Sequence, residues 1–266
     1  LDKPLPVQYG IFIRDVLHGN FGKSYIYGKP AMDPIFERMP ATLELVAVAA
    51  CLVLCIAIPL GVYAGAYPKR ASSKLIMSGS ILGISLPSFW VGMMMIYIFA
   101  VVLRLLPASG RGNTVMVGNV ALSIFAPGGI RYVILPAITL ALTNVATMLR
   151  LTRSGILENM RQDYIKFARA KGVPAKSILF GHALKNALIP VVTIFGMDLG
   201  NMIAFTTITE TIFAWPGMGK LLIDAINKSD RPIIVAYLMA AACMFVVLNF
   251  IVDILYTLID PRIELR

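Results

Sequence analysis

The chain is poor in charge. Only 14% of its 266 residues are Asp, Glu, Lys or Arg, while 58% are hydrophobic, and the mean hydropathy is +0.78. A soluble domain ordinarily carries about 25% charged residues, because its surface must face water. The shortage of charge therefore excludes an ordinary water-soluble protein and predicts a membrane protein.

Cysteine and histidine are scarce as well. The three cysteines, Cys51, Cys55 and Cys243, all lie in apolar runs, so no disulfide framework is indicated. Cys51 and Cys55 are one helical turn apart, but no third cysteine or histidine joins them, which argues against a metal site. Neither of the two histidines has a plausible Ser, Cys or carboxylate partner. We therefore expect no catalytic residue, metal or cofactor in this chain.

Basic residues outnumber acidic ones by 24 to 14, and the net charge is +10. The basic residues are confined to the gaps between apolar runs. This placement is typical of a membrane protein with basic cytoplasmic loops rather than of a surface that binds DNA. We expect membrane lipid as a partner and no nucleic acid.

Long apolar runs are abundant. A helix that crosses a bilayer needs about 20 mostly apolar residues. Five segments meet this requirement: 41–66, 75–105, 131–149, 187–209 and 233–259. The second is long enough to tilt or bend, and Pro87 gives a reason for a bend. The predicted fold class is an all-α polytopic membrane protein.

The basic residues beside the spans predict the orientation. The gap 67–74 has three basic residues and no acidic one, and the gap 150–186 has eight against two. Because basic residues gather in short cytoplasmic loops, we expect both gaps and the C-terminus in the cytoplasm, and the polar residues 1–40 outside. A chain with five spans and a cytoplasmic C-terminus has its N-terminus outside, and a signal peptide or an upstream helix must carry that N-terminus across the membrane. Residues 1–40 contain no signal peptide, so we expect a sixth span upstream.

Residues 19–24, Gly-Asn-Phe-Gly-Lys-Ser, look at first like a phosphate-binding loop. That loop requires G-x4-G-K-[ST], so that enough backbone N–H groups surround the phosphates. Leu17 occupies the position of the first glycine, and no predicted strand precedes it. We therefore reject the motif and expect ATP hydrolysis on another polypeptide.

The segment between the third and fourth spans predicts two short helices joined at a glycine. A helix that ends near Lys171 places this cation at its negative end. Gly172 can adopt the left-handed conformation that closes a helix, and Pro174 suits the first turn of the next. Such a basic, largely aliphatic elbow could dock in a groove of a partner. A DNA-reading hairpin and a surface loop without a partner are the alternatives that this pattern leaves open.

Several separated motifs occur in the order that one family shows. They are Arg38-Met-Pro-Ala-Thr42, Leu86-Pro-Ser-Phe-Trp90, Leu106-Pro-Ala-Ser-Gly110, residues 163–174, residues 182–193, residues 210–219 and Asp260-Pro-Arg262. Through these motifs essentially the whole chain resembles the inner-membrane B-type permeases of the dipeptide, oligopeptide and nickel ABC importers. The resemblance implies a type I ABC importer permease fold, with six spans and a permease domain at 41–266.

In that family the loop at 154–186 would be the coupling loop, which seats in a cleft on an ATPase subunit. In the wider superfamily this loop carries the motif Glu-Ala-Ala-x3-Gly. In this chain Lys166 occupies the position of the Glu, and only Ala168 and Gly172 match the motif. The coupling residues implied by the resemblance are Lys166, Ala168, Arg169, Ala170, Lys171, Gly172, Val173 and Pro174.

The resemblance also implies an assembly in the cytoplasmic (inner) membrane of a bacterium. The chain would pair with a second homologous permease subunit, with two ATPase subunits that hold ATP and Mg, and with a periplasmic or extracellular solute-binding protein. The expected cargo is a di- or oligopeptide, moved inward by alternating access. A nickel chelate, haem, an opine or an oligosaccharide is the alternative cargo. An ATP-independent secondary transporter or channel, and a membrane-bound enzyme, are further alternatives.

Polar side chains also fall in or beside the spans. Asp198 and Asn201 lie one turn apart in the fourth span, and are candidates for the translocation path or for a helix–helix hydrogen bond. By the resemblance, Glu210 borders the external gate, although an interfacial turn is equally compatible with its surroundings. Glu44 is expected at the outer start of the first span, where it would complement the helix dipole.

Overall fold

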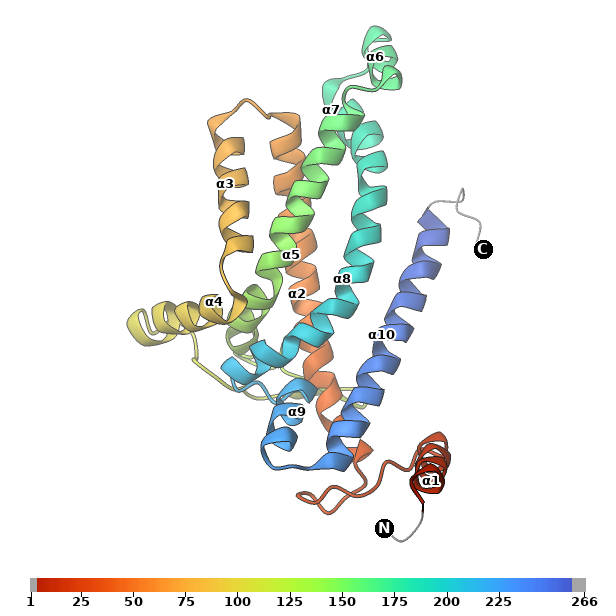
Figure 1. Cartoon of the computed structure of the whole chain (residues 1–266). Helices are drawn as coiled ribbons and strands as arrows, with labels where there is room; N and C mark the ends of the chain where they lie inside the picture. Colours follow the sequence, from red (N-terminus) through yellow and green to blue (C-terminus); the bar gives the residue numbers. More distant parts are fainter. Residues whose placement is uncertain (1–3, 260–266) are drawn as a thin grey trace.

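The computed structural model describes residues 4–259, which form a bundle of long helices (Figure 1). Three helices lie side by side at its centre: α2 (Met32–Ala66), α5 (Ile130–Asn159) and α8 (Leu184–Ile212). The motif at 260–262 and the C-terminus that was predicted to be cytoplasmic lie outside the described residues.

The central helices approach closely because small residues line their contact. A Cβ atom at Gly61 of α2 would lie 2.6 Å from Thr152 Cβ of α5, and one at Gly65 would lie 2.7 Å from Ile156 Cβ. Helices in a bilayer associate mainly through such backbone-close packing, because lipid offers no hydrophobic contrast. Around this contact, buried apolar side chains of α2, α5 and α8, such as Leu45, form one continuous core.

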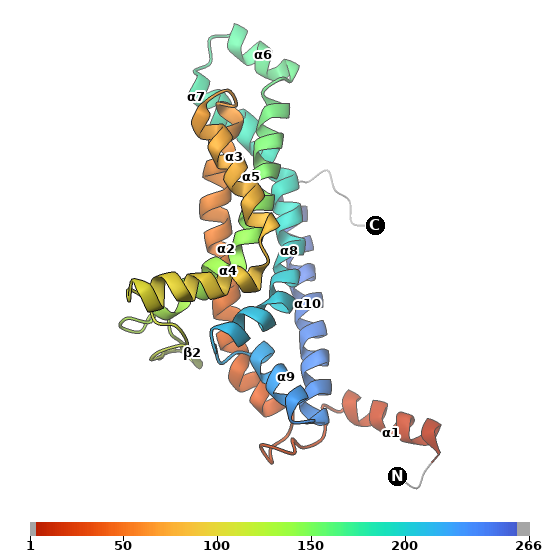
Figure 2. The same ribbon diagram turned by 60° about the vertical axis from the view of Figure 1, so that its left-hand side comes forward.

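The second predicted span is broken. α3 (Ala71–Ser85) runs back along α2 and α5, and α4 (Ser88–Met95), continued by the π-helix η1 (Ile96–Val102), leaves at an angle of 105°. Figure 2 shows α4 projecting away from the bundle. Leu86 is extended, as expected for a residue before proline, and Pro87 has no N–H to continue the helix. The bend expected at Pro87 is confirmed, and it divides the predicted segment 75–105 into two helices.

A loop at 103–129 connects η1 to α5 and contains a small antiparallel hairpin. Strand β1 (Val115–Val117) pairs with β2 (Val120–Leu122), with Met116 opposite Ala121. Gly118, with φ of +63°, supplies the left-handed backbone that the tight turn needs. The hairpin is a small addition to the predicted all-α class, and it was not predicted because three-residue strands leave too short a pattern to detect.

The elbow segment precedes α8. It consists of α6 (Asp163–Ala170), α7 (Ala175–Ser177) and the π-helix η2 (Ile178–Ala183), and the run Ala175–Ile212 is continuous. Helix α9 (Met218–Asn227) follows α8, and α10 (Arg231–Ile259) packs against α8 and α9.

The N-terminal segment is more helical than expected. Helix α1 (Leu5–Leu17) has no buried residue, and α2 begins at Met32 rather than at residue 41. The first turns of α2 contain polar residues such as Asp33 and Glu37, so they do not form part of an apolar run and were not predicted as helix. Asp230, which is fully buried, holds the intervening loop, since Ser24 Oγ donates a hydrogen bond to its Oδ2 at 2.5 Å.

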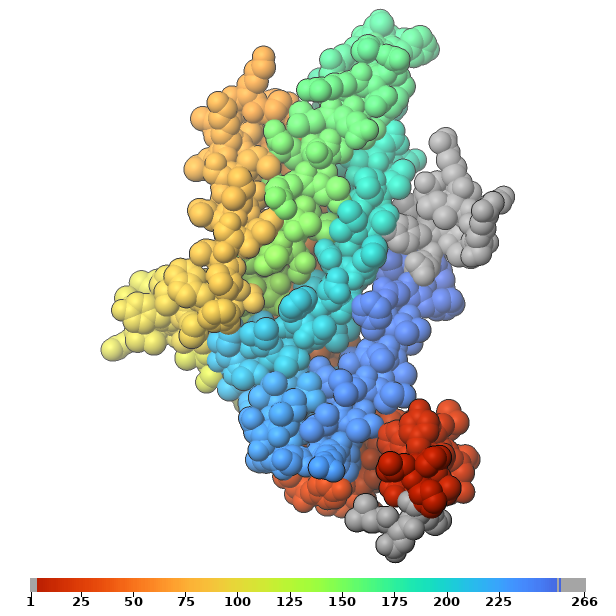
Figure 3. Space-filling view, in the orientation of Figure 1, coloured from red at the N-terminus to blue at the C-terminus, as the bar shows by residue number. Residues whose placement is uncertain are grey.

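Within residues 4–259, four helical runs are long and apolar enough to cross a membrane: α2, α5, Ala175–Ile212 and the 231–252 part of α10. The broken pair of α3 with α4 and η1 could add a fifth. The five predicted spans fall on these elements, but the number of spans, like the upstream sixth, stays a prediction. The elbow and the turn at 67–70 lie at one end of the bundle, whereas α1, α9 and the 103–129 loop lie toward the other (Figures 1 and 3).

Candidate functional site

The elbow has the predicted helix–glycine–helix form. Helix α6 ends at Ala170, and Gly172 has a φ of +76°, in the left-handed region. The N–H groups of Gly172 and Val173 donate hydrogen bonds to the carbonyls of Arg169 and Ala168, at 2.9 and 3.1 Å, and these bonds close the helix. Pro174 then precedes the first residue of α7. A Cβ at Gly172 would meet no atom within 4 Å, so only the backbone conformation requires glycine there.

Helix α6 of the elbow is fixed to the bundle by one buried side chain and one hydrogen-bonded group. Ile165 of α6 is fully buried in a cluster with residues of α2, α5 and η2. The Tyr164 hydroxyl donates to Asn159 Oδ1 at 2.7 Å and accepts from Asn186 Nδ2 at 2.9 Å. Because Asn159 ends α5 and Asn186 lies in the first turn of α8, this hydroxyl connects α6 to both helices.

The outer surface of the elbow is basic and partly aromatic. Six of the eight predicted coupling residues are exposed, and the other two, Ala168 and Val173, are half-buried. Lys171 Nζ lies 4.5 Å from the ring centre of Phe167, which is 61% exposed. Such a surface suits a groove that has apolar walls and acidic edges.

Lys166 forms an ion pair with Asp163, with 2.8 Å between Nζ and Oδ1. The hydrogen bond and charge of Lys166 lower the pKa of the Asp163 carboxyl. A lowered pKa means that this pair supports the folded elbow above the ordinary pKa of aspartate, and that its support is lost as the pH falls through the lowered value. At neutral pH the pair is therefore intact.

A cavity of about 230 Å³ opens between α5, α8 and the start of α4. Its polar lining consists of Ser88, Thr139, Thr143, Asn144, Asp198, Asn201 and Thr209. The structure therefore places two of the three predicted path residues, Asp198 and Asn201, on one hollow at the middle of α8.

One face of α8 packs against α10, and the opposite face lines the cavity. Gly196 and Gly200 face α10, where added side chains would collide with Val252 and Phe245. Asp198 projects from the opposite side, because two residues correspond to about 200° of helical rotation. Its side-chain hydrogen-bond partner is Asn201 of the same helix, so the described residues give Asp198 no helix–helix hydrogen bond.

Glu210, the third predicted path residue, does not line the cavity. It is fully buried at the end of α8, where its Oε1 accepts a hydrogen bond from Thr42 Oγ1 at 2.7 Å and its Oε2 accepts one from Lys220 N at 2.9 Å. Lys220 is in the first turn of α9, so the carboxylate satisfies N–H groups that the helix leaves unpaired. Glu210 thereby joins α2, α8 and α9.

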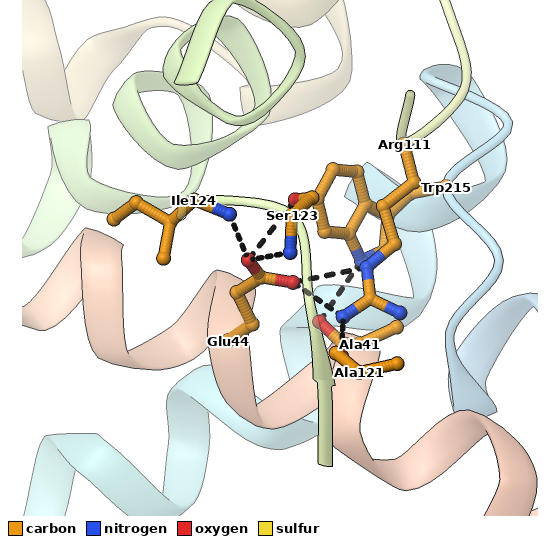
Figure 4. A network of polar contacts seen from close by, with 7 residues as sticks. All are labelled: Ala41, Glu44, Arg111, Ala121, Ser123, Ile124 and Trp215. Carbon is orange, nitrogen blue, oxygen red and sulfur yellow. Dashed lines mark hydrogen bonds and ion pairs between the residues drawn. The ribbon is translucent and has the colours of Figure 1, made fainter. Parts of the chain in front are cut away.

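Glu44 anchors the 103–129 loop (Figure 4). Its Oε1 accepts hydrogen bonds from the backbone N–H groups of Ser123 and Ile124, each at 2.7 Å, and its Oε2 accepts one from Arg111 Nε at 2.9 Å. The expectation that Glu44 complements the dipole at a helix start is wrong, because α2 begins three turns earlier, at Met32.

Trp215 lies beside this ion pair and is fully buried. Its Nε1 donates to Ala41 O at 2.9 Å, and its ring lies 5.6 Å from the Arg111 guanidinium carbon. Gly110 N donates to Phe213 O at 2.9 Å. Residues of three separated motifs, 38–42, 106–110 and 210–219, therefore meet at the end of the bundle opposite the elbow.

Several of these side chains were not singled out from the sequence, namely Thr42, Arg111, Tyr164, Asn186 and Asp230. Thr42 lies inside one of the quoted motifs and Arg111 directly follows another. Their position in or next to a motif is the sequence signal that could have identified them. Their partners are far away in sequence: Thr42 and Glu210 are separated by 168 residues. In the described part of the chain, no group of three or more His, Cys, Asp and Glu side chains could hold a metal.

Apolar helices around a polar cavity, with an elbow outside them, are typical of a multi-pass membrane transport subunit. Residues 57–265 match the model of the binding-protein-dependent transport system inner membrane component, and the chain belongs to this family. It is therefore a permease component of an ABC importer, in the inner membrane.

Named relatives cover nearly the whole chain. The dipeptide transport system permease protein DppB of Alkalihalophilus pseudofirmus is 37% identical over 99% of this chain and 83% of its own length. The oligopeptide transport system permease protein AppB of Bacillus subtilis is 40% identical over 99% of this chain and 82% of its own.

Among solved structures, an inward-facing MetNI methionine ABC transporter has a similar fold. The TM-score is 0.62 at 16% identity, and the match covers 83% of this chain and 93% of the other. At this identity the likeness concerns the fold alone, which agrees with the predicted ABC importer permease fold.

Proposed function

We propose that the chain is the permease subunit of an importer for di- or oligopeptides, driven by ATP hydrolysis on separate subunits. The observation that carries this proposal is the elbow. It is basic, protrudes from the bundle, and is tied through Tyr164 to the last residue of α5 and the first turn of α8. An element of this kind can transmit the closure of a partner to the helices that surround a path.

In this proposal the elbow, the turn at 67–70 and the C-terminus face the cytoplasm, and residues 1–40 face outward. The basic gaps 67–74 and 150–186 support the orientation. Two ATPase subunits, holding ATP and Mg, bind beneath this permease and a second, homologous one. A solute-binding protein docks on the opposite end, where α9 and the 103–129 loop lie.

Peptide as the cargo is supported by the names of the relatives, which are dipeptide and oligopeptide transport permeases. Asp198 and Asn201 belong to the translocation path in this proposal, whereas Glu210 frames its outer end. ATP binding closes the ATPase subunits, moves the elbow, and opens the helices outward.

Reconstitution tests the proposal. Proteoliposomes would contain the complete importer, with binding protein outside and ATP inside, and the uptake of a labelled dipeptide would be measured. We expect uptake only when both ATP and binding protein are present. Uptake that follows an ion gradient without ATP would contradict the proposal, and so would uptake of a nickel chelate, haem, an opine or an oligosaccharide in place of peptide.

A further inference from the structure

Asp198 is a carboxylate at membrane depth without a cationic partner. It belongs to none of the ion pairs found among residues 4–259. The lining of its cavity contains no Lys, Arg or His. Along α8 itself the nearest basic residue is Lys185, 13 residues away, or about 20 Å along the helix axis. A charged group in such a place is costly and usually has a functional partner.

The neighbours of Asp198 in the cavity are neutral hydrogen-bonding groups. Asn201, Thr143 and Asn144 supply amide and hydroxyl oxygens, while Met202 and Phe205 supply apolar wall. An ammonium group has three donors and no acceptor, so it matches one carboxylate surrounded by neutral acceptors. The carboxylate of Asp198 would repel an anion, and the lining has no basic residue to offset this repulsion.

The size of the cavity indicates how much of a solute it can hold. At about 30 Å³ for each water-sized group, 230 Å³ has room for roughly seven such groups. This is enough for one end of a peptide. A single carboxylate, half-buried and without a cage of further charges, binds an ammonium weakly enough to release it, as a site on a transport path must do.

We propose that this cavity is a transit site for the free α-amino group of the transported peptide, with Asp198 as its counter-ion and Asn201, Thr143 and Asn144 as hydrogen-bond acceptors. This inference rests on the proposed function. It goes further in assigning the recognised group, a protonated primary amine, and the residue that recognises it in the membrane.

The first experiment measures the charge preference of the cavity. Cys51, Cys55 and Cys243, which are exposed, are replaced by serine, and Ser88→Cys places a thiol on the lining. In the assembled importer in detergent, a cationic thiol reagent is expected to react several-fold faster than an anionic one of the same size. The ratio should fall toward one with Asp198→Asn and stay unchanged with Glu37→Gln, which removes an exposed carboxylate elsewhere.

Protection by peptide identifies the occupant. A dipeptide with a free amino terminus should slow labelling of Ser88→Cys, and its N-acetyl derivative should not. The difference should disappear with Asp198→Asn. Equal protection by both peptides would overturn the inference, and so would protection by sodium or potassium ions at the same concentration as the peptide.

Uptake by the reconstituted importer supplies the functional readout. Asp198→Asn should lower the maximal rate of dipeptide uptake about tenfold with little change in KM, because the binding protein sets capture. Asp198→Glu should restore part of the rate. If the wild-type importer takes up no peptide, the proposed function fails. If it takes up peptide while Asp198→Asn keeps the wild-type rate and labelling ratio, only this inference fails.

Discussion

Three buried carboxylates, Glu44, Glu210 and Asp230, lie at the end of the bundle away from the elbow, and the hydrogen bonds of each cross between elements. A buried acceptor that is fully paired costs little, whereas its removal leaves donors unsatisfied. These residues therefore hold the loops and short helices of this end in one arrangement. Their contacts indicate a structural contribution, and of the three only Glu210 was also a candidate for the translocation path.

Glu210→Ala tests this role. Thr42 Oγ1 and Lys220 N would lose their acceptor, and each unsatisfied buried donor costs about 1–3 kcal/mol. We expect a lower thermal unfolding midpoint in detergent, by several degrees, with Glu210→Gln intermediate because it keeps one acceptor oxygen. An unchanged midpoint for Glu210→Ala would show that the buried carboxylate does not stabilise this end.

Tyr164→Phe tests the connection between the elbow and the bundle. It keeps the ring and removes only the hydroxyl that bonds Asn159 and Asn186. Because Tyr164 is 39% exposed, we expect little change in stability. The number of ATP molecules hydrolysed per peptide imported should rise several-fold in proteoliposomes. Exposed Tyr25→Phe, at the opposite end, is the matched control, and an equal effect of both variants would contradict the proposed connection.

At the scale of elements, the elbow depends on one backbone conformation. The left-handed φ of Gly172 costs an ordinary L-residue roughly 1–2 kcal/mol, and asparagine tolerates it better than other residues. A β-branched side chain is the least compatible with it. The space around the Cβ position is open, so substitution there tests conformation rather than steric fit.

We therefore expect Gly172→Val to uncouple ATP hydrolysis from peptide uptake, and Gly172→Asn to retain most coupling. Both rates would be measured on the same proteoliposomes. If Gly172→Val kept normal coupling, the turn geometry would be irrelevant to coupling. If both variants failed equally, the left-handed conformation would not be the feature that matters.

The elements also show which predictions the sequence supports. The elbow was predictable because its signals, Lys171, Gly172 and Pro174, are local and adjacent. The bend at Pro87 was predictable for the same reason, but its angle of 105° was not, because α4 is positioned by contacts with α5 and α8, which are distant in sequence. The early start of α2 escaped detection since its first turns are polar and their packing depends on α9 and α10.

For the molecule as a whole, the two ends have different designs. At one end a few local interactions hold a protruding elbow, and at the other end long-range hydrogen bonds join motifs that are up to 176 residues apart. The polar cavity lies between them, on the face shared by α5 and α8. Sequence reasoning placed Asp198 and Asn201 correctly in mid-helix. It could not show that they line a cavity, because Thr139 and Thr143 come from a different helix.

The central claim is that the elbow docks on an ATPase subunit, and cross-linking tests it most directly. Ala170→Cys places a thiol on the exposed elbow, and Asn227→Cys places one at the exposed end of α9, both in a background without the native cysteines. In the assembled importer, a short thiol-to-amine cross-linker should join Ala170→Cys to an ATPase subunit and leave Asn227→Cys unlinked to it. The opposite pattern, or linkage of Ala170→Cys to the solute-binding protein, would contradict the account.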